Sequence, residues 1–138
     1  MRAMELEEKR DELLLAALAH VPFEGWSNKA LRLAAADLAW DATMPERLFP
    51  GGAADAVEHY SDYADRRMVV ELAEHDLTNL RVPQRIALGI RLRLERCAPD
   101  RESVRRAVTL LALPNNSARA LCCTYRSVDQ LWRAVGDT

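Results

Sequence analysis

The stretch His20-Val21-Pro22-Phe23-Glu24-Gly25-Trp26-Ser27 decides the fold, because it forms a corner between a first helix and the helices that follow. Pro22 ends the first helix, since the residue before a proline is pushed out of the α region. Gly25 then lets the backbone turn, and Ser27 is a good N-cap for the next helix. The corner therefore predicts a helix, a tight turn and a new helix.

Two aromatic side chains lie inside this corner. Trp26 is five residues before Leu31, the spacing of a hydrophobic staple that fixes the direction of the next helix. Phe23 is the second ring. Apolar rings in so short a loop favour burial, so we expect both to fill the junction between helices. Direct contact with a ligand is the alternative.

Apolar residues recur at helical spacing on both sides of the corner. The stripes are Leu14, Ala17, Leu18 and Val21, then Leu31, Ala34, Ala35 and Leu38, then Val57, Tyr60, Ala64, Met68 and Leu72, then Val104, Ala107, Val108 and Leu111, and last Ala118, Leu121, Tyr125, Val128 and Trp132. The long third stripe predicts a helix from Ala53 to about His75, and Gly136 is a natural residue to end the last helix. No alternation of period two is present, so the predicted fold class is all-α.

Pro83 is predicted to begin a further helix that reaches about Cys97, because its missing N–H costs nothing at a first helical position. This helix is rich in leucine, isoleucine and arginine. We predict that Ile86, Ile90 and Leu94 face inward. The side chains predicted to face water are Arg85, Arg91, Arg93 and Arg96.

The composition is that of a globular chain of one domain, or of one domain and part of another. Of the 138 residues, 49% are hydrophobic and 29% charged, and no apolar run approaches the roughly 20 residues that a membrane helix needs. Residues 1–12 hold five acids, unlike a signal or transit peptide, so a cytoplasmic location is expected. Cys97, Cys122 and Cys123 fit no disulfide framework and no zinc spacing, and they are predicted to be small buried residues.

Charge is divided unevenly along the chain. Residues 1–76 hold 16 acids and 8 bases, a net charge of −8, whereas residues 77–138 hold 11 arginines and 5 acids, a net charge of +6. The basic half suits an anionic membrane surface or an acidic partner, but the pattern favours arginine-rich helices with a solvated face.

Three short helices followed by longer ones is the order of a TetR-type regulator, with a helix-turn-helix head and a ligand-binding body. We expect the head over residues 1–50 and the body over residues 51–138. The segment 27–49 carries three bases and three acids, so it lacks the cationic charge that dominates DNA affinity. Pro45 also shortens the would-be recognition helix, which Thr43 and Glu46 begin as a capping box. The head is therefore predicted to be degenerate and not to bind DNA.

Several motifs together resemble one known family. They are His20-Val21-Pro22-Phe23-Glu24-Gly25-Trp26, Leu48-Phe49-Pro50-Gly51-Gly52, Arg85-Ile86, Arg91-Leu92-Arg93-Leu94-Glu95, Ala112-Leu113-Pro114-Asn115 and Val128-Asp129-Gln130-Leu131-Trp132-Arg133-Ala134-Val135-Gly136-Asp137-Thr138. The set resembles the accessory lipid-binding family of coenzyme Q (ubiquinone) biosynthesis, the ninth of the numbered pathway set, in its α-proteobacterial form.

The resemblance implies a TetR-like fold that has lost DNA binding. It also implies a pocket for isoprenoid lipids of the ubiquinone pathway, presentation of these lipids to a di-iron hydroxylase, and a homodimer. In the family the sequence continues past the motif that ends at Thr138 to an amphipathic helix used at the membrane. The body is thus expected to be truncated relative to the family. Peripheral contact with the inner face of a bacterial membrane is also expected, but no residue of this sequence is assigned to it.

The inward stripes of the body are rich in small residues, which leaves room for a long apolar ligand; the alternative is that alanines let helices pack closely. We predict a lipid pocket between the long helices. Its predicted lining is Tyr60, Ala64, Met68, Leu72, Ile86, Ile90, Leu111, Leu121, Tyr125 and Trp132.

Catalysis finds little support in the sequence. His20, His59 and His75 are scattered, and Glu71 with His75 is a common chance pair on one helix rather than a metal site. No phosphate-binding loop or nucleophile elbow is present. We expect no enzyme, no metal and no cofactor besides the lipid ligand. The alternatives to a lipid-binding accessory protein are a TetR-type transcriptional regulator and a helical interaction module that docks a partner through residues such as Arg91 and Arg93.

Overall fold

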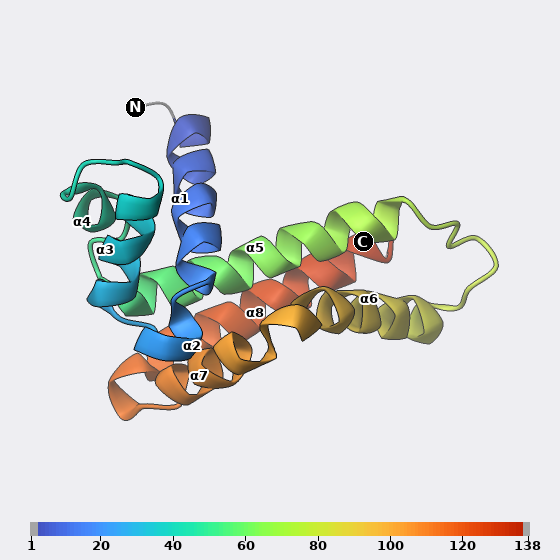
Figure 1. Ribbon diagram of the computed structural model, residues 1–138. Helices are drawn as coiled ribbons and strands as arrows, with labels where there is room; N and C mark the ends of the chain where they lie inside the picture. The colour runs from blue at the N-terminus through green and yellow to red at the C-terminus, as the bar shows by residue number, and fades with distance from the viewer. Residues whose placement is uncertain (1–2, 137–138) are drawn as a thin grey trace.

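The computed structural model describes residues 3–136, and all regular secondary structure in that range is helical (Figure 1). The elements are α1 (Ala3–Leu18), α2 (Val21–Glu24), α3 (Asn28–Asp37), α4 (Met44–Leu48), α5 (Ala53–Ala73), α6 (Val82–Cys97), the 3-10 turn η1 (Ala98–Asp100), α7 (Arg101–Leu111), the 3-10 turn η2 (Pro114–Asn116) and α8 (Ser117–Ala134). The all-α prediction is confirmed, and the helix order is consistent with a TetR-like fold.

The corner has part of the local geometry that its residues predict. The prediction that Pro22 ends the first helix is wrong, because α1 already ends at Leu18 and Pro22 lies in the first turn of α2. Gly25 has a φ of +69°, in the left-handed region, and the Ser27 hydroxyl accepts a hydrogen bond from the Ala30 N–H at 3.1 Å. The Trp26 indole N–H donates to the Ser103 carbonyl at 2.9 Å, and its ring centroid is 5.7 Å from that of Tyr60. Trp26 therefore fills the junction, as predicted.

The prediction for Phe23 is wrong, because 86% of this residue is exposed. The reason is α2, a single helical turn that the sequence did not lead us to expect. Helical turns place neighbouring residues on different faces, and here Val21 is the residue that is fully buried. Phe23 consequently points away from the junction that Trp26 occupies.

The front helices pack around α1, which stands across the beginning of α5 (Figure 1). One buried cluster joins α1 to α3, α4 and α5, and its members include Leu13, Ala17, Leu31, Leu48 and Phe49. A second cluster lies on the other side of α1 and consists of Leu14, Tyr60, Ala64 and Cys97. Trp26 packs against both clusters, so the corner is where they meet.

A polar joint also connects α1 to α5. Asp11 accepts hydrogen bonds from Arg66 at 2.7 and 3.0 Å, and one of its oxygens is 2.6 Å from the His59 ring. Burial alone would raise the pKa of Asp11, but the hydrogen bonds from Arg66 and His59 outweigh it and hold this pKa below its ordinary value. The charged carboxylate therefore contributes to the stability of the joint.

We expect Asp11→Asn to reduce the free energy of unfolding by about 1 kcal/mol at pH 7, since the Asp11 side chain is 20% exposed and solvent screens the pair. A folded-state pKa below the unfolded one adds stability above the unfolded value of about 3.9, and this stability is lost as pH falls toward the folded value. Urea unfolding at several pH values should show the difference between wild type and variant shrink below about pH 4. A difference that is constant down to pH 2 would contradict this role.

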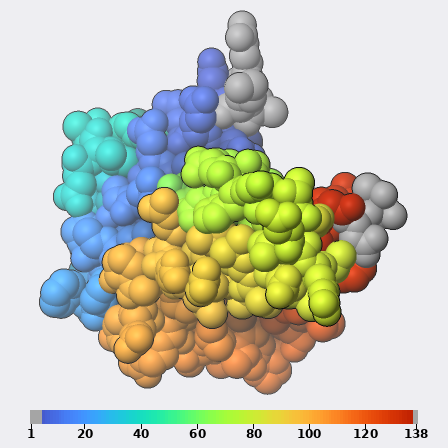
Figure 2. Space-filling view, turned by 90° about the vertical axis from the view of Figure 1, so that its right-hand side faces the viewer, coloured from blue at the N-terminus to red at the C-terminus, as the bar shows by residue number. Residues whose placement is uncertain are grey.

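The back of the molecule is a bundle in which α5 packs along both α6 and α8 (Figure 1). Figure 2 looks along this bundle from the α5–α6 loop and shows α6 in yellow, resting on the orange segments that follow it. Gly89 is buried in α6 where the helices approach closely, and a Cβ added there would lie 2.4 Å from the Cδ1 atom of Leu131 in α8. The glycine therefore allows α6 and α8 to touch.

Ion pairs and small residues form much of the α5–α8 interface. Arg119 of α8 lies 2.5 Å from Asp55 and 2.9 Å from Glu58, and Arg126 is 3.0 Å from Glu58. Cys123 is the buried residue of α8 between these arginines. Burial raises the pKa of its thiol, as expected for a packed side chain.

The structure corrects the predicted faces of α6 and α8. Ile90 and Leu94 were expected to face inward, but they are 47% and 62% exposed, whereas Arg85 and Arg93 turn toward protein groups. Arg85 donates to the Val135 carbonyl at 3.0 Å. The last apolar stripe also points outward: the exposed residues are Leu121 (73%), Tyr125 (73%), Val128 (59%) and Trp132 (47%), which we call the α8 crest. Val108 of α7 is likewise 62% exposed.

Smaller predictions had mixed outcomes. α4 begins after Thr43 as expected, but the capping box is absent, because the Thr43 hydroxyl donates to Asp41 instead. Cys97 and Cys123 are buried as predicted, and the prediction for Cys122 is wrong, since it is exposed. Gly136 has a φ of +84° after the end of α8, as expected of a residue that ends a helix.

Candidate functional site

An open apolar groove lies between α6 and α8, with α5 as its floor and α7 at one end. Its volume is about 600 Å³. The lining residues are Ser61, Met68, Ile90, Arg93, Leu94, Val108, Leu111, Ala112, Ala120, Cys123, Thr124, Ser127, Val128 and Leu131. Aliphatic side chains therefore dominate a hollow large enough for a small organic ligand, with a few polar groups among them.

A smaller inner pocket of about 140 Å³ continues from the groove between α5, α6 and α7. The two hollows share five lining residues: Ser61, Arg93, Leu94, Val108 and Leu111. Tyr60 also lines the inner pocket, and its buried hydroxyl has no hydrogen-bond partner among residues 3–136. Burial, with the neighbouring Cys97, raises the pKa of this phenol, so it stays protonated.

A buried polar network forms the floor between the helices. Asp65 of α5 is 1% exposed, and its two oxygens accept hydrogen bonds from Arg93 Nε and from the Ser127 hydroxyl, each at 2.9 Å. Arg93 also reaches the Ser61 carbonyl at 3.4 Å and the Ser61 hydroxyl at 3.3 Å. One carboxylate thus connects α5, α6 and α8 beneath the groove.

The sequence analysis did not place Asp65 or Arg93 in the predicted lipid site, and it considered Arg93 only as a residue that could dock a partner. A usable signal for Asp65 was its place on the buried face of the long helix, four residues after Ser61 and directly after Ala64. An acid on such a face needs a partner, and arginines on the next helix were the candidates. The choice among those arginines depends on tertiary contacts.

The ten residues predicted to line a lipid pocket occupy different surroundings. Tyr60, Ala64 and Leu111 line the inner pocket, and Met68, Ile90 and Leu111 line the groove. Leu72 is fully buried near Gly89, and Ile86 is partly buried. The others, Leu121, Tyr125 and Trp132, lie on the α8 crest and line neither hollow.

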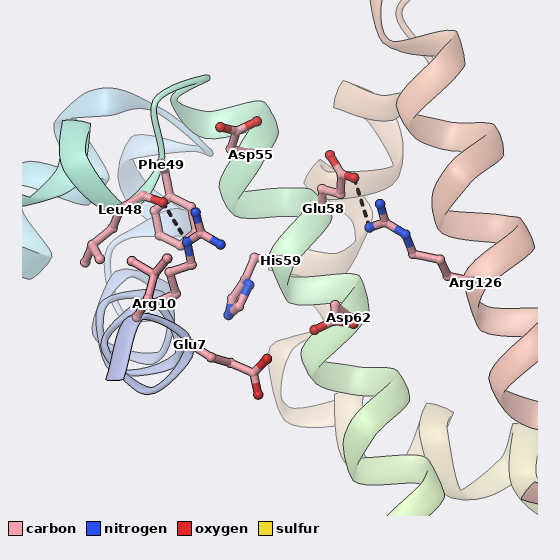
Figure 3. A pocket seen from close by; sticks show the side chains of 10 residues that line it. Glu7, Arg10, Leu48, Phe49, Asp55, Glu58, His59, Asp62 and Arg126 are labelled. Carbon is pink, nitrogen blue, oxygen red and sulfur yellow. Dashed lines mark hydrogen bonds and ion pairs between the residues drawn. The ribbon is translucent and has the colours of Figure 1, made fainter. Parts of the chain in front are cut away.

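A third hollow, of about 540 Å³, lies where α1 meets α5 and α8, and its lining is mostly charged (Figure 3). Its carboxylates are already paired with arginines: Glu58 with Arg126, and Asp62 with Arg66. Arg10 donates to the Leu48 carbonyl at 2.8 Å, across the same cleft. These groups hold helices together, and an apolar ligand would have to displace their water.

The head presents few groups of the kind that contact DNA. α4 has five residues, and its exposed side chains are Glu46 and Arg47. Residues 3–136 contain no cluster of metal-ligating side chains, and Glu71 pairs with Arg96 while the His75 ring bonds to the Glu71 carbonyl. Within the same residues, no helix combines the length and apolarity needed to cross a bilayer.

No protein-family model matches the chain. Curated proteins do: it is 29% identical over 132 residues to the mitochondrial ubiquinone biosynthesis protein COQ9 of Drosophila melanogaster, which covers 93% of this chain. It is 26% identical over 138 residues to human COQ9, and 28% identical to COQ9-B of Xenopus laevis, each covering 95% of this chain. This chain is similar to the COQ9 proteins. Similarity to COQ9 thus extends over nearly all of its length.

The chain spans less than half of each COQ9 relative: 40% of the Drosophila melanogaster protein, 43% of the human protein and 47% of the Xenopus laevis protein. The COQ9 names assign those proteins to ubiquinone biosynthesis, and they name no reaction.

Proposed function

We propose that this chain binds isoprenoid lipids of the ubiquinone pathway and presents them to a partner hydroxylase. The observation that carries the proposal is the apolar groove between α6 and α8, together with the inner pocket behind it. Isoprenoid tails are long and purely hydrocarbon, and burial of their surface in such a groove is favourable by roughly 25 cal/mol per Å². The choice of the ubiquinone pathway is supported by similarity to the COQ9 proteins, whose names assign them to ubiquinone biosynthesis.

The openness of the groove supports the presentation step. Residues at its rim, Ile90, Leu94 and Val128, remain about half exposed or more, so a lipid in the groove would keep one side accessible from outside. A lipid enclosed on all sides would need a conformational opening before transfer. The exposed α8 crest beside the groove offers an apolar surface on which the hydroxylase would dock.

Extraction of natively purified protein with organic solvent, followed by mass spectrometry, tests the binding step. We expect isoprenoid quinones or their biosynthetic precursors in amounts that rise in proportion to protein. Material purified after unfolding and refolding without lipid is the control and should be empty. An extract from native protein that contains only bulk phospholipid, in the proportions of the host membrane, would contradict the proposal.

A further inference from the structure

We propose that the guanidinium of Arg93 holds the polar head of the ligand, and that this head is uncharged and carries an oxygen that accepts hydrogen bonds. The inference rests on the proposed lipid-binding function and specifies it. Arg93 lies where the groove and the inner pocket meet. Of the five residues that line both hollows, three are aliphatic, and the two polar ones are Ser61 and Arg93. Ser61 is itself a partner of Arg93.

The geometry of Arg93 leaves donors for a ligand. A guanidinium has five N–H groups, and here Nε donates to Asp65 at 2.9 Å while Nη2 makes longer bonds of 3.3 and 3.4 Å to Ser61. Nη1 has no acceptor within residues 3–136. The side chain is 27% exposed, so it is oriented by Asp65 and still accessible from the hollows.

Charge determines which head fits. Asp65 is 1% exposed and faces Arg93, so the floor of the groove carries one positive and one negative charge side by side. A second carboxylate at Arg93 would meet the field of Asp65 in surroundings of low dielectric, where like charges repel strongly. A carbonyl, ether or phenolic oxygen accepts the same N–H groups without that repulsion. The ring oxygens of quinone-type heads belong to this class.

The aliphatic residues that line the rest of the groove indicate where the hydrocarbon tail of the ligand would lie. From Arg93 the groove is bordered by Ile90 and Leu94 on α6 and by Val108 and Val128 on the facing helices. A head held at Arg93 thus leaves an attached hydrocarbon chain against aliphatic side chains, and the ligand class is an isoprenoid tail on an uncharged, oxygen-bearing ring.

The test compares three probes of equal carbon number in a displacement assay with a fluorescent apolar dye. The probes are a benzoquinone with a short isoprenoid tail, an isoprenoid hydrocarbon and a fatty acid. Wild type should bind the quinone about tenfold more tightly than either other probe, the effect of a hydrogen bond from a charged donor. In Arg93→Lys, which keeps the charge but loses the planar fork, the preference should fall to about twofold or less.

Arg91→Lys is the matched control, because Arg91 is on the same helix with its side chain 68% exposed, and it should keep the tenfold preference. If Arg93→Lys does not fold, the paired variant Asp65→Leu with Arg93→Met gives the same readout. Equal binding of quinone and hydrocarbon by wild type, or an unchanged preference in the Arg93 variant, would overturn the role of Arg93 and leave lipid binding intact. Tightest binding of the fatty acid would overturn the uncharged head. Failure of all three probes to bind would instead refute the proposed function.

Discussion

Asp65→Ala is expected to lower the free energy of unfolding by about 3 kcal/mol, the largest single effect that the structure predicts. Removing one partner of a buried pair leaves the other charge uncompensated, at a typical cost of 3–5 kcal/mol. The lower end applies because the Arg93 side chain is 27% exposed and reaches water through the groove. The substitution also removes the acceptor of the Ser127 hydroxyl, which connects α5 to α8. Chemical denaturation monitored by circular dichroism measures the loss.

Asp129→Ala is the matched control, since Asp129 pairs with Arg133 on the same helix and has a side chain 36% exposed. We expect a change of about 0.5 kcal/mol or less from it, as is usual for exposed pairs one helical turn apart. The paired variant Asp65→Leu with Arg93→Met should recover most of the lost stability, because apolar replacement of a whole buried pair is often neutral. Equal losses from Asp65→Ala and Asp129→Ala would show that the buried network does not stabilise the body.

Leu94→Glu is expected to reduce the isoprenoid lipid retained through purification by about tenfold or more. Leu94 lines both the groove and the inner pocket and is 62% exposed, so the variant should fold normally. A carboxylate at this rim would have to lose water when an apolar tail enters, and that cost opposes binding. The change in unfolding free energy should stay within about 0.5 kcal/mol, as for most surface substitutions.

Leu15→Glu provides the comparison for this experiment. Leu15 is 45% exposed on α1 and lines neither hollow, so the same chemical change there should leave the lipid content unaltered. Lipid content is measured per mole of folded protein by quantitative mass spectrometry of the extract. If both variants retain as much lipid as wild type, the groove is not where the lipid binds.

The turn at Gly25 and the start of α3 were predictable from sequence because their determinants are local. Gly25 permits the left-handed backbone and Ser27 caps the next helix, whatever packs nearby, whereas Pro22 lies inside α2 and does not end α1. The all-α class was predictable for a similar reason, since the period of the apolar stripes fixes the element type. The exposure of Phe23 was not predictable, because it depends on α2. This helix has only four residues, too few to show an apolar periodicity in the sequence, and it buries Val21 while it exposes Phe23.

The faces of α6 and α8 were not predictable by the same reasoning. A period of 3.6 shows that residues such as Leu121 and Tyr125 share a face, but it does not show what that face contacts. In α8 the opposite face packs on α5 through Cys123, Ser127 and the ion pairs of Arg119. In α6 the pairing of Arg93 with Asp65 joins residues 28 apart in sequence, and no local spacing encodes it. The predicted lining therefore includes residues of the two hollows, such as Met68 and Leu111, but not their polar floor.

Trp26 has a consequence for how the protein is made. Its indole packs against both buried clusters and donates to the carbonyl of Ser103, 77 residues later in the chain. While the ribosome has released only the front helices, neither that acceptor nor the neighbouring ring of Tyr60 is available to the indole. The Trp26 side chain can therefore make its final contacts only after the segment that contains Ser103 has emerged, so this part of the corner matures late in the synthesis of the chain.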